Sequence, residues 1–172
     1  MPHYIVTHNP DAKAVFSDKI PQENVQLPGP FGSMEILSTT HNGPINVSTE
    51  SDIDQYAHDR SAGLGNSICP ENGTATAILN MAPGCESPLH RTMTLDVAIV
   101  IQGVLELHLD SGEKVTLSAG DSVVQRAGMH KWVNITPNDQ EGGWAKMIGF
   151  AQCIAQPLEI GGKQLETEFV MS

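Results

Sequence analysis

The chain is organised around residues 84–134, which read GCESPLHRTMTLDVAIVIQGVLELHLDSGEKVTLSAGDSVVQRAGMHKWVN. Apolar residues fill runs of strand length in this stretch, and Gly, Pro or Asp closes each run. Runs closed in this way are typical of antiparallel strands joined by tight turns. His90, Asp96 and His130 lie on different runs, so only folding can bring them together. We take their convergence as the predicted functional site.

The same pattern continues on both sides of this stretch. Strands are expected over residues 4–7, 13–16, 33–40, 74–81, 96–101, 104–109, 114–117, 122–125, 131–135 and 145–152. Many short strands separated by regular turns predict an all-β barrel or sandwich. We expect one domain, with an N-terminal arm, loop and first strands (1–73), a barrel core (74–155) and a C-terminal tail (156–172).

Three segments outside the core have weaker patterns. Residues 41–73 are polar, and we expect a long loop there that serves as a lid, with one helical turn over residues 51–57. The tail is expected to carry a short helix or a terminal strand. The arm reads as a hairpin of the kind that adds to a partner's sheet, so we expect a homodimer.

The net charge of the chain limits the kinds of partner that it can bind. Its 172 residues carry 20 acidic and 9 basic side chains, a net charge of −11. Phosphate backbones would repel such a chain, so we expect no nucleic-acid partner. No apolar run is long enough to span a bilayer and no signal-like segment opens the sequence, so we expect a cytoplasmic protein with no membrane partner. Three widely spaced cysteines argue against a disulfide framework or a zinc knuckle.

Two motifs within residues 84–134 carry a resemblance to the cupin superfamily. The first cupin motif is Gly, five residues, His-x-His, three or four residues, Glu, six residues, Gly, and this sequence keeps every spacing with Gly84, His90, Thr92, Asp96 and Gly103. The second motif is matched by Gly120, Arg126 in place of Pro, His130 one residue early, and Asn134.

The whole chain is similar to small single-domain cupins (cupin type 2) of bacteria and fungi, some of them associated with natural-product tailoring. The resemblance implies a jelly-roll β-barrel, often dimeric. It does not imply one reaction, because cupins include dioxygenases, isomerases, decarboxylases, dehydratases and inert binders.

The departures from the family pattern bear on the metal. Cupins that bind a metal typically use three His and one Glu, whereas here Thr92 replaces a His and Asp96 replaces the Glu. The remaining set, His90, Asp96 and His130, leaves two alternatives open. It holds one divalent iron, manganese or zinc ion, or it is a metal-free acid–base site. Asp96 has two interpretations of its own, a ligand or a structural hydrogen-bonding group.

The resemblance and the alternation of side chains along strands assign a role to each residue. His130 is the predicted general base, His90 the group that polarises or protonates the substrate, and Asp96 orients a histidine or binds a metal. The predicted substrate-binding residues are Gln125, Trp132 and Thr92.

The leading hypothesis for the function is a lyase or isomerase, of dehydratase or decarboxylase type, that acts on a small polyketide-like or carboxylated molecule in secondary metabolism. The alternatives are a non-haem metal-dependent dioxygenase and a non-catalytic cupin that binds a small ligand.

Overall fold

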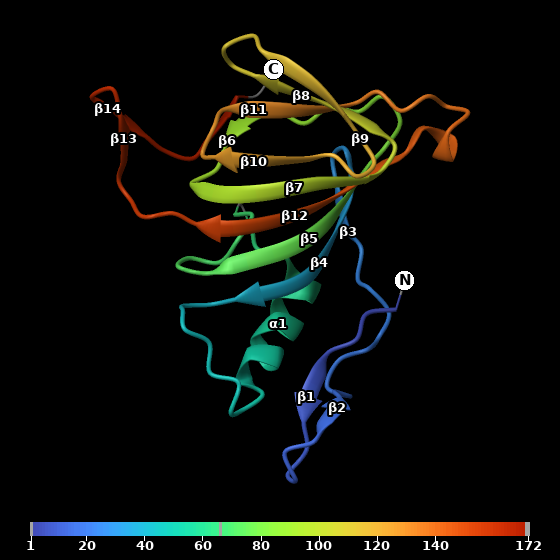
Figure 1. Ribbon diagram of the computed structural model, residues 1–172, viewed down its shortest axis with the longest axis vertical. Coiled ribbons are helices and arrows are strands. Elements are labelled where there is room, and N and C mark those ends of the chain that lie inside the picture. The colour runs from blue at the N-terminus through green and yellow to red at the C-terminus, as the bar shows by residue number, and fades with distance from the viewer. Residues whose placement is uncertain (1, 66, 171–172) are drawn as a thin grey trace.

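Two antiparallel sheets form the body of the protein, seen in a computed structural model that describes residues 2–65 and 67–170 (Figure 1). The larger sheet has the strand order β10 (Ser122–Arg126), β7 (Thr94–Gln102), β12 (Ala145–Cys153), β5 (Thr74–Met81), β4 (Gly32–Thr40) and β3 (Leu27–Gly29). The smaller sheet has the order β15 (Glu168–Val170), β6 (Leu89–Arg91), β11 (His130–Asn134), β8 (Val104–Leu109) and β9 (Lys114–Ser118). The predicted all-β, jelly-roll type of fold is confirmed.

One hydrophobic cluster joins the two sheets. Its fully buried members include Met81 and Val100 from the larger sheet and Leu105 from the smaller one, and Trp132 packs with them. The alternation of apolar and polar residues along β8 produces this arrangement, because every second side chain of a strand points to the same face. Trp132 also lines a cavity between the sheets.

The motif glycine Gly103 closes the turn between β7 and β8. Its φ of +75° is a left-handed conformation that side-chain-bearing residues rarely adopt. A Cβ at this position would also collide with the Thr136 hydroxyl and the Trp144 carbonyl. The spacing of the first motif is therefore set by a tight turn that only glycine fits.

The helix α1 (Ser51–Ala62) is longer than the single turn expected over residues 51–57. The expectation was wrong because local amphipathicity is weak there and packing on β4 supplies the stability instead. Ile53 and Tyr56 are buried together with Ile36, and the Tyr56 hydroxyl donates a hydrogen bond of 3.0 Å to the Ile36 carbonyl. A 3-10 turn at Glu141–Gly143 is the other helical element of the described residues. No helix within residues 2–65 and 67–170 is long and apolar enough to cross a membrane.

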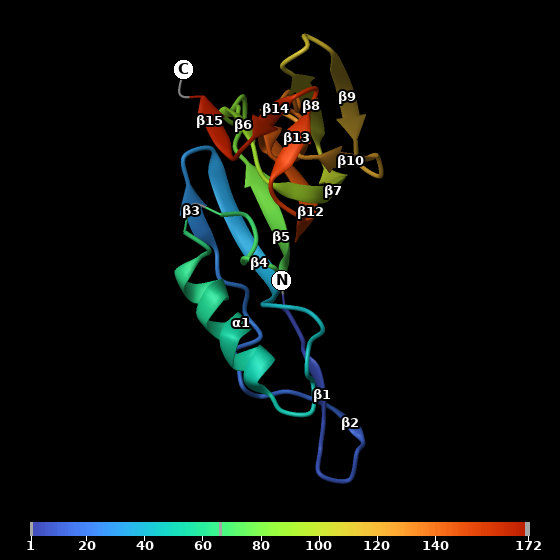
Figure 2. The same ribbon diagram turned by 90° about the vertical axis from the view of Figure 1, so that its left-hand side faces the viewer.

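The N-terminal arm lies away from the two sheets, whereas the C-terminal tail adds a strand to the smaller sheet. The arm is a hairpin of β1 (Val6–His8) and β2 (Ala14–Phe16) that projects away from both sheets (Figure 2). The tail forms a hairpin of β13 (Leu158–Ile160) and β14 (Lys163–Leu165), and its terminal strand β15 pairs with β6. A terminal strand was one of the two expected forms of the tail. The homodimer that the arm suggested stays a prediction.

Candidate functional site

Two imidazole rings meet where β6 and β11 pair in the smaller sheet. His90 and His130 are direct register partners, although 40 residues separate them in sequence. Their ring centroids lie 4.4 Å apart with the planes tilted by 50°. The predicted convergence of these two side chains is therefore what the fold produces.

Both rings are held in the same way by the backbone. Nδ1 of His90 lies 2.8 Å from the Pro88 carbonyl oxygen, and Nδ1 of His130 lies 2.9 Å from the Gly128 carbonyl oxygen. A carbonyl oxygen only accepts, so each Nδ1 carries the hydrogen and donates it. In the neutral ring this leaves the Nε2 lone pair free on both histidines, able to take a proton or to bind a metal.

His130 is the more deeply buried of the two. Burial lowers the pKa of His130 to about 4, outweighing the hydrogen bond to Gly128, and the neighbouring His90 lowers it slightly further. The ring is therefore neutral at neutral pH. A neutral imidazole with a free Nε2 is chemically a base.

His130 lines a cavity of about 110 Å³ between the two sheets, which we call the barrel cavity. Four other predicted site residues line the same cavity: Thr92, Asp96, Gln125 and Trp132. The remaining wall is apolar and comes mainly from Met34, Ile68, Ala75, Ala77, Leu79, Ala98, Met147, Phe150 and Ala151. A few polar groups in an apolar wall are typical of sites for small organic molecules.

Asp96 is a buried carboxyl group on the inner side of β7. Its cross-strand partners are Gln125 on β10 and Ala151 on β12. Its Oδ1 atom is buried and has no hydrogen-bond partner among the residues that the structure describes. Burial raises the pKa of Asp96 to about 6, although the Thr94 hydroxyl offsets part of that effect. The barrel cavity thus combines a weak base with a carboxyl group that holds its proton more tightly than usual.

His90 has a different environment from the one expected. It is half-buried and does not line the barrel cavity; its ring stacks on Phe169 of β15, with the centroids 5.6 Å apart and the planes 3° from parallel. The two rings touch, but His90 is not among the residues that line the barrel cavity. The pairing of β15 with β6 brings Phe169 to this place, directly opposite His90. The role of His90 as the group that polarises or protonates the substrate stays a prediction.

The predicted metal set His90, Asp96 and His130 is not assembled as three ligands. Among residues 2–65 and 67–170, no three His, Cys, Asp or Glu side chains lie close enough together to hold an ion. The donors at hand are two imidazole nitrogens, fewer than the three or four protein ligands that zinc and iron sites typically use. The residues therefore do not fit the predicted three-ligand site. Whether the protein binds a divalent ion at all stays a prediction.

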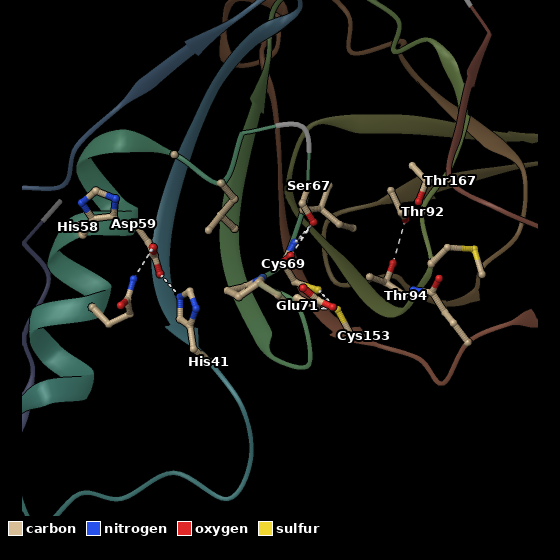
Figure 3. A pocket seen from close by; sticks show the side chains of 17 residues that line it. His41, His58, Asp59, Ser67, Cys69, Glu71, Thr92, Thr94, Cys153 and Thr167 are labelled. Carbon is tan, nitrogen blue, oxygen red and sulfur yellow. Dashed lines mark hydrogen bonds and ion pairs between the residues drawn. The ribbon is translucent and has the colours of Figure 1, made fainter.

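A larger pocket of about 550 Å³ lies next to the barrel cavity (Figure 3), and we call it the vestibule. It is bordered by α1, by residues 67–71 and by the turn between β6 and β7. Thr92 and Ile68 line both the vestibule and the barrel cavity. The vestibule and the barrel cavity therefore adjoin at these two residues.

Sequence reasoning missed one polar group of the vestibule. Asp59 accepts hydrogen bonds from Thr39 at 2.5 Å and from Gln55 at 3.3 Å, and its Oδ2 lies 2.7 Å from Nε2 of His41. Burial would raise the pKa of Asp59, but these bonds hold it below its ordinary value. The residues come from β4, its end and α1, and no motif in the sequence marks them. The expectation that residues 41–73 serve as a lid stays a prediction.

Comparisons with known proteins place this site within a family. A family model described as a cupin domain matches residues 77–140. A cupin-domain-containing oxidoreductase of Aspergillus ruber, fogC, is 33% identical over 164 residues, 95% of this chain and 77% of that relative. The phomopsin biosynthesis cluster protein C' of Diaporthe leptostromiformis is 33% identical over 163 residues, 94% of this chain and 82% of that relative. All the predicted site residues lie within the matched segment 77–140.

Among solved structures, a sugar phosphate isomerase of the cupin superfamily from Silicibacter pomeroyi is similar to part of this chain. The sequence identity is 24%, the TM-score is 0.40, and the similarity covers 49% of this chain and 52% of that chain. A similarity this partial says nothing about the activity of this chain.

Proposed function

This chain belongs to the cupin family, and we propose that it is an enzyme of secondary metabolism that moves protons on a small organic substrate in the barrel cavity. One observation carries the proposal. His130, a neutral base, and Asp96, a carboxyl group with a raised pKa, line the same small cavity in an otherwise apolar wall. Groups whose environments separate their proton affinities from the ordinary values are candidates for acid–base roles.

The proposed reaction is an isomerisation or an elimination. Nε2 of His130 takes a proton from a carbon next to a carbonyl group, while the Asp96 carboxyl group donates its proton to the oxygen that gains electron density. In an isomerisation that proton ends on the product, and in a dehydration it leaves with the hydroxyl group as water. Proton transfer from His130 back to Asp96 then restores both groups. A positioned acid or base of this kind contributes about 10²–10⁴-fold in rate.

The sizes of the two spaces limit the substrate. The barrel cavity, about 110 Å³, admits a small fragment, whereas the adjoining vestibule of about 550 Å³ has the volume of an ordinary ligand pocket. We therefore propose a substrate that places its reacting carbon in the cavity and its larger polar part in the vestibule. A polyketide-like molecule with a carbonyl or carboxylate group has this form. The names of relatives in biosynthesis clusters support a role in secondary metabolism.

The test uses proton exchange, because it needs no knowledge of the final product. A panel of small β-hydroxy and β-dicarbonyl compounds is incubated with the protein in heavy water, and deuterium at carbon is followed by NMR. His130→Gln and Asp96→Asn should each lose exchange about 10²–10⁴-fold. His108→Gln, which changes a histidine bonded to Glu106 outside the cavity, is the matched control and should keep it. Full exchange by His130→Gln would rule out this assignment.

A second candidate is an oxidoreductase, the activity printed in the name of fogC. The observation in its favour is the pair of histidines with free Nε2 atoms at a centroid separation of 4.4 Å. Elemental analysis of the purified protein together with oxygen consumption separates the two candidates. Oxygen uptake that depends on an added divalent ion, with no exchange in heavy water, would favour the oxidoreductase. Binding of panel compounds without either activity would favour a non-catalytic cupin.

A further inference from the structure

Two cysteine sulfur atoms face each other at one wall of the vestibule (Figure 3). Cys69 lies between α1 and β5, and Cys153 is the last residue of β12, 84 positions later. Their Sγ atoms are 2.9 Å apart. A disulfide bond is about 2.0 Å long, so a small movement of either side chain would form one. Wide spacing in the sequence gave no sign of this proximity.

The two thiols differ in how a reagent reaches them. Cys69 is buried, with 1% of its surface exposed, and packs with Ala75 and Ala151. Burial, reinforced by the neighbouring Cys153, raises the pKa of Cys69 to about 12, so this group stays a thiol. Cys153 is half-buried, and its Sγ donates to the Pro70 carbonyl oxygen at 3.1 Å. Cys153 is therefore the thiol that reacts first with a reagent from solution, and Cys69 reacts second.

The residues around Cys69 connect this pair to the barrel cavity. Ile68, the preceding residue, lines both the vestibule and the cavity. The Ser67 hydroxyl bonds to the Cys69 carbonyl oxygen at 2.5 Å, which ties residues 67–69 into one local unit. Ala75 and Ala151, which pack on Cys69, also line the cavity. A covalent bond from Cys69 to β12 would fix the position of Ile68 between the two spaces.

We propose that Cys69 and Cys153 are a reversible thiol–disulfide pair that fixes residues 67–70 at the border between the vestibule and the barrel cavity. The oxidant is a small-molecule disulfide. Cys153, as a thiolate, attacks one of its sulfur atoms and releases the first small group as a thiolate, leaving a mixed disulfide on the protein. Cys69 gives its proton to that released thiolate as it attacks the mixed disulfide, which forms the Cys69–Cys153 bond and releases the second small group as a thiolate. The second thiolate takes up the proton that Cys153 had lost, so both small groups end as thiols. The two protein thiols are oxidised and one small disulfide is reduced to two thiols.

The third cysteine provides the control. Cys85 lies in the turn between β5 and β6 and does not line the vestibule. Trypsin leaves Cys69 and Cys85 on one peptide, because no Lys or Arg lies between Arg60 and Arg91. The Cys85→Ser variant therefore assigns the linkage without ambiguity. The proposal does not rest on the proposed enzymatic function, so either can fail alone.

The first experiment measures the bond. Reduced full-length protein is equilibrated with mixtures of oxidised and reduced glutathione, the remaining thiols are alkylated, and peptides are identified by mass spectrometry. Wild type and Cys85→Ser should both lose two hydrogen atoms, show the Cys69–Cys153 linkage, and return to the thiol form with dithiothreitol. Cys69→Ser should stop at the mixed disulfide on Cys153. Complete alkylation of both thiols at the most oxidising mixture, or equal linkage of Cys85, would overturn the proposal.

The second experiment measures the fixed segment. Amide hydrogen exchange of residues 67–69 is compared between the oxidised and reduced forms of Cys85→Ser, because Pro70 has no amide hydrogen. Because a cross-link removes open conformations of the segment that it closes, exchange should slow about tenfold on oxidation. Unchanged exchange would show that the bond does not fix this segment and would overturn that part of the proposal. A linkage that appears only after unfolding in denaturant would equally count against the pair as a native device.

Discussion

Asp96 and His130 should change the free energy of unfolding in opposite directions as the pH rises, and replacing Asp96 with Asn should reveal this. The pKa of Asp96 is raised from its ordinary 3.8 to about 6, so its contribution to stability is full below about pH 4 and is lost as the pH rises through 6. The pKa of His130 is lowered from 6.5 to about 4, so its contribution is present above 6.5 and is lost as the pH falls through 4. The two effects have opposite signs over the same pH range.

The contributions of the two pKa shifts to the unfolding free energy are nearly equal in size. Each pKa moves by roughly two units, which corresponds to about 3 kcal/mol of unfolding free energy. In the wild type the two contributions therefore largely cancel between about pH 4 and 6. Asp96→Asn removes one of them, so the unfolding free energy of this variant, relative to the wild type, should rise by about 3 kcal/mol across that range. His130→Gln should show the reverse slope.

Urea unfolding at a series of pH values measures these differences, with the midpoint converted to free energy at a constant m value. Subtracting the wild-type curve removes the other carboxyl groups, such as Glu35 and Asp59, which are unchanged in the variants. Asp110→Asn, which alters an exposed carboxylate in the turn after β8, is the control for the loss of one carboxyl group. A flat difference for Asp96→Asn would refute the burial argument and remove the acid from the proposed mechanism.

Three further changes test the fold and the assembly. Leu105→Ala should lower the unfolding free energy by about 2–5 kcal/mol in urea titrations, because Leu105 is fully buried between the sheets, and a loss below 1 kcal/mol would contradict that placement. Tyr56→Phe should cost about 1 kcal/mol by the same measurement, through loss of the bond to Ile36 that holds α1 on β4, while an unchanged midpoint would mean the bond adds nothing. Phe16→Ser, on the exposed face of the arm, should shift the expected homodimer towards monomer in analytical ultracentrifugation, and a wild type that sediments as a monomer would end that prediction.

The core strands could be predicted from the sequence because their signals are local. The strands over 74–81 and 104–109 begin and end where the alternation and the turn residues predict. The motif spacing also brought His90 and His130 together correctly. In both cases a pattern within a few residues, or a fixed spacing, contains the information.

The contacts that could not be predicted join segments far apart in the chain. The strand β6 has three residues and exists because it pairs with β11 and β15, so no local run announces it. The position of His90 against Phe169 follows from that pairing. In the same way, Cys69 meets Cys153 and His41 meets Asp59 through the packing of the vestibule walls. The sequence contains the residues of these groups but no periodicity that places them.

The pH dependence of turnover decides which form of Asp96 acts. If Asp96 donates a proton, turnover needs Asp96 protonated and His130 neutral, and kcat/KM should follow a bell with limits near the two pKa values, about 4 and about 6. If Asp96 instead accepts a proton as a carboxylate, turnover should rise as the pH passes 6 and should not fall again in that region. The first outcome makes the pair most active where both groups are uncharged, because the apolar wall that moves their pKa values favours that state. A profile that rises through pH 6 would make Asp96 the base and would remove His130 as a proton-transferring partner, because His130 stays neutral at that pH, while leaving the cavity as the site.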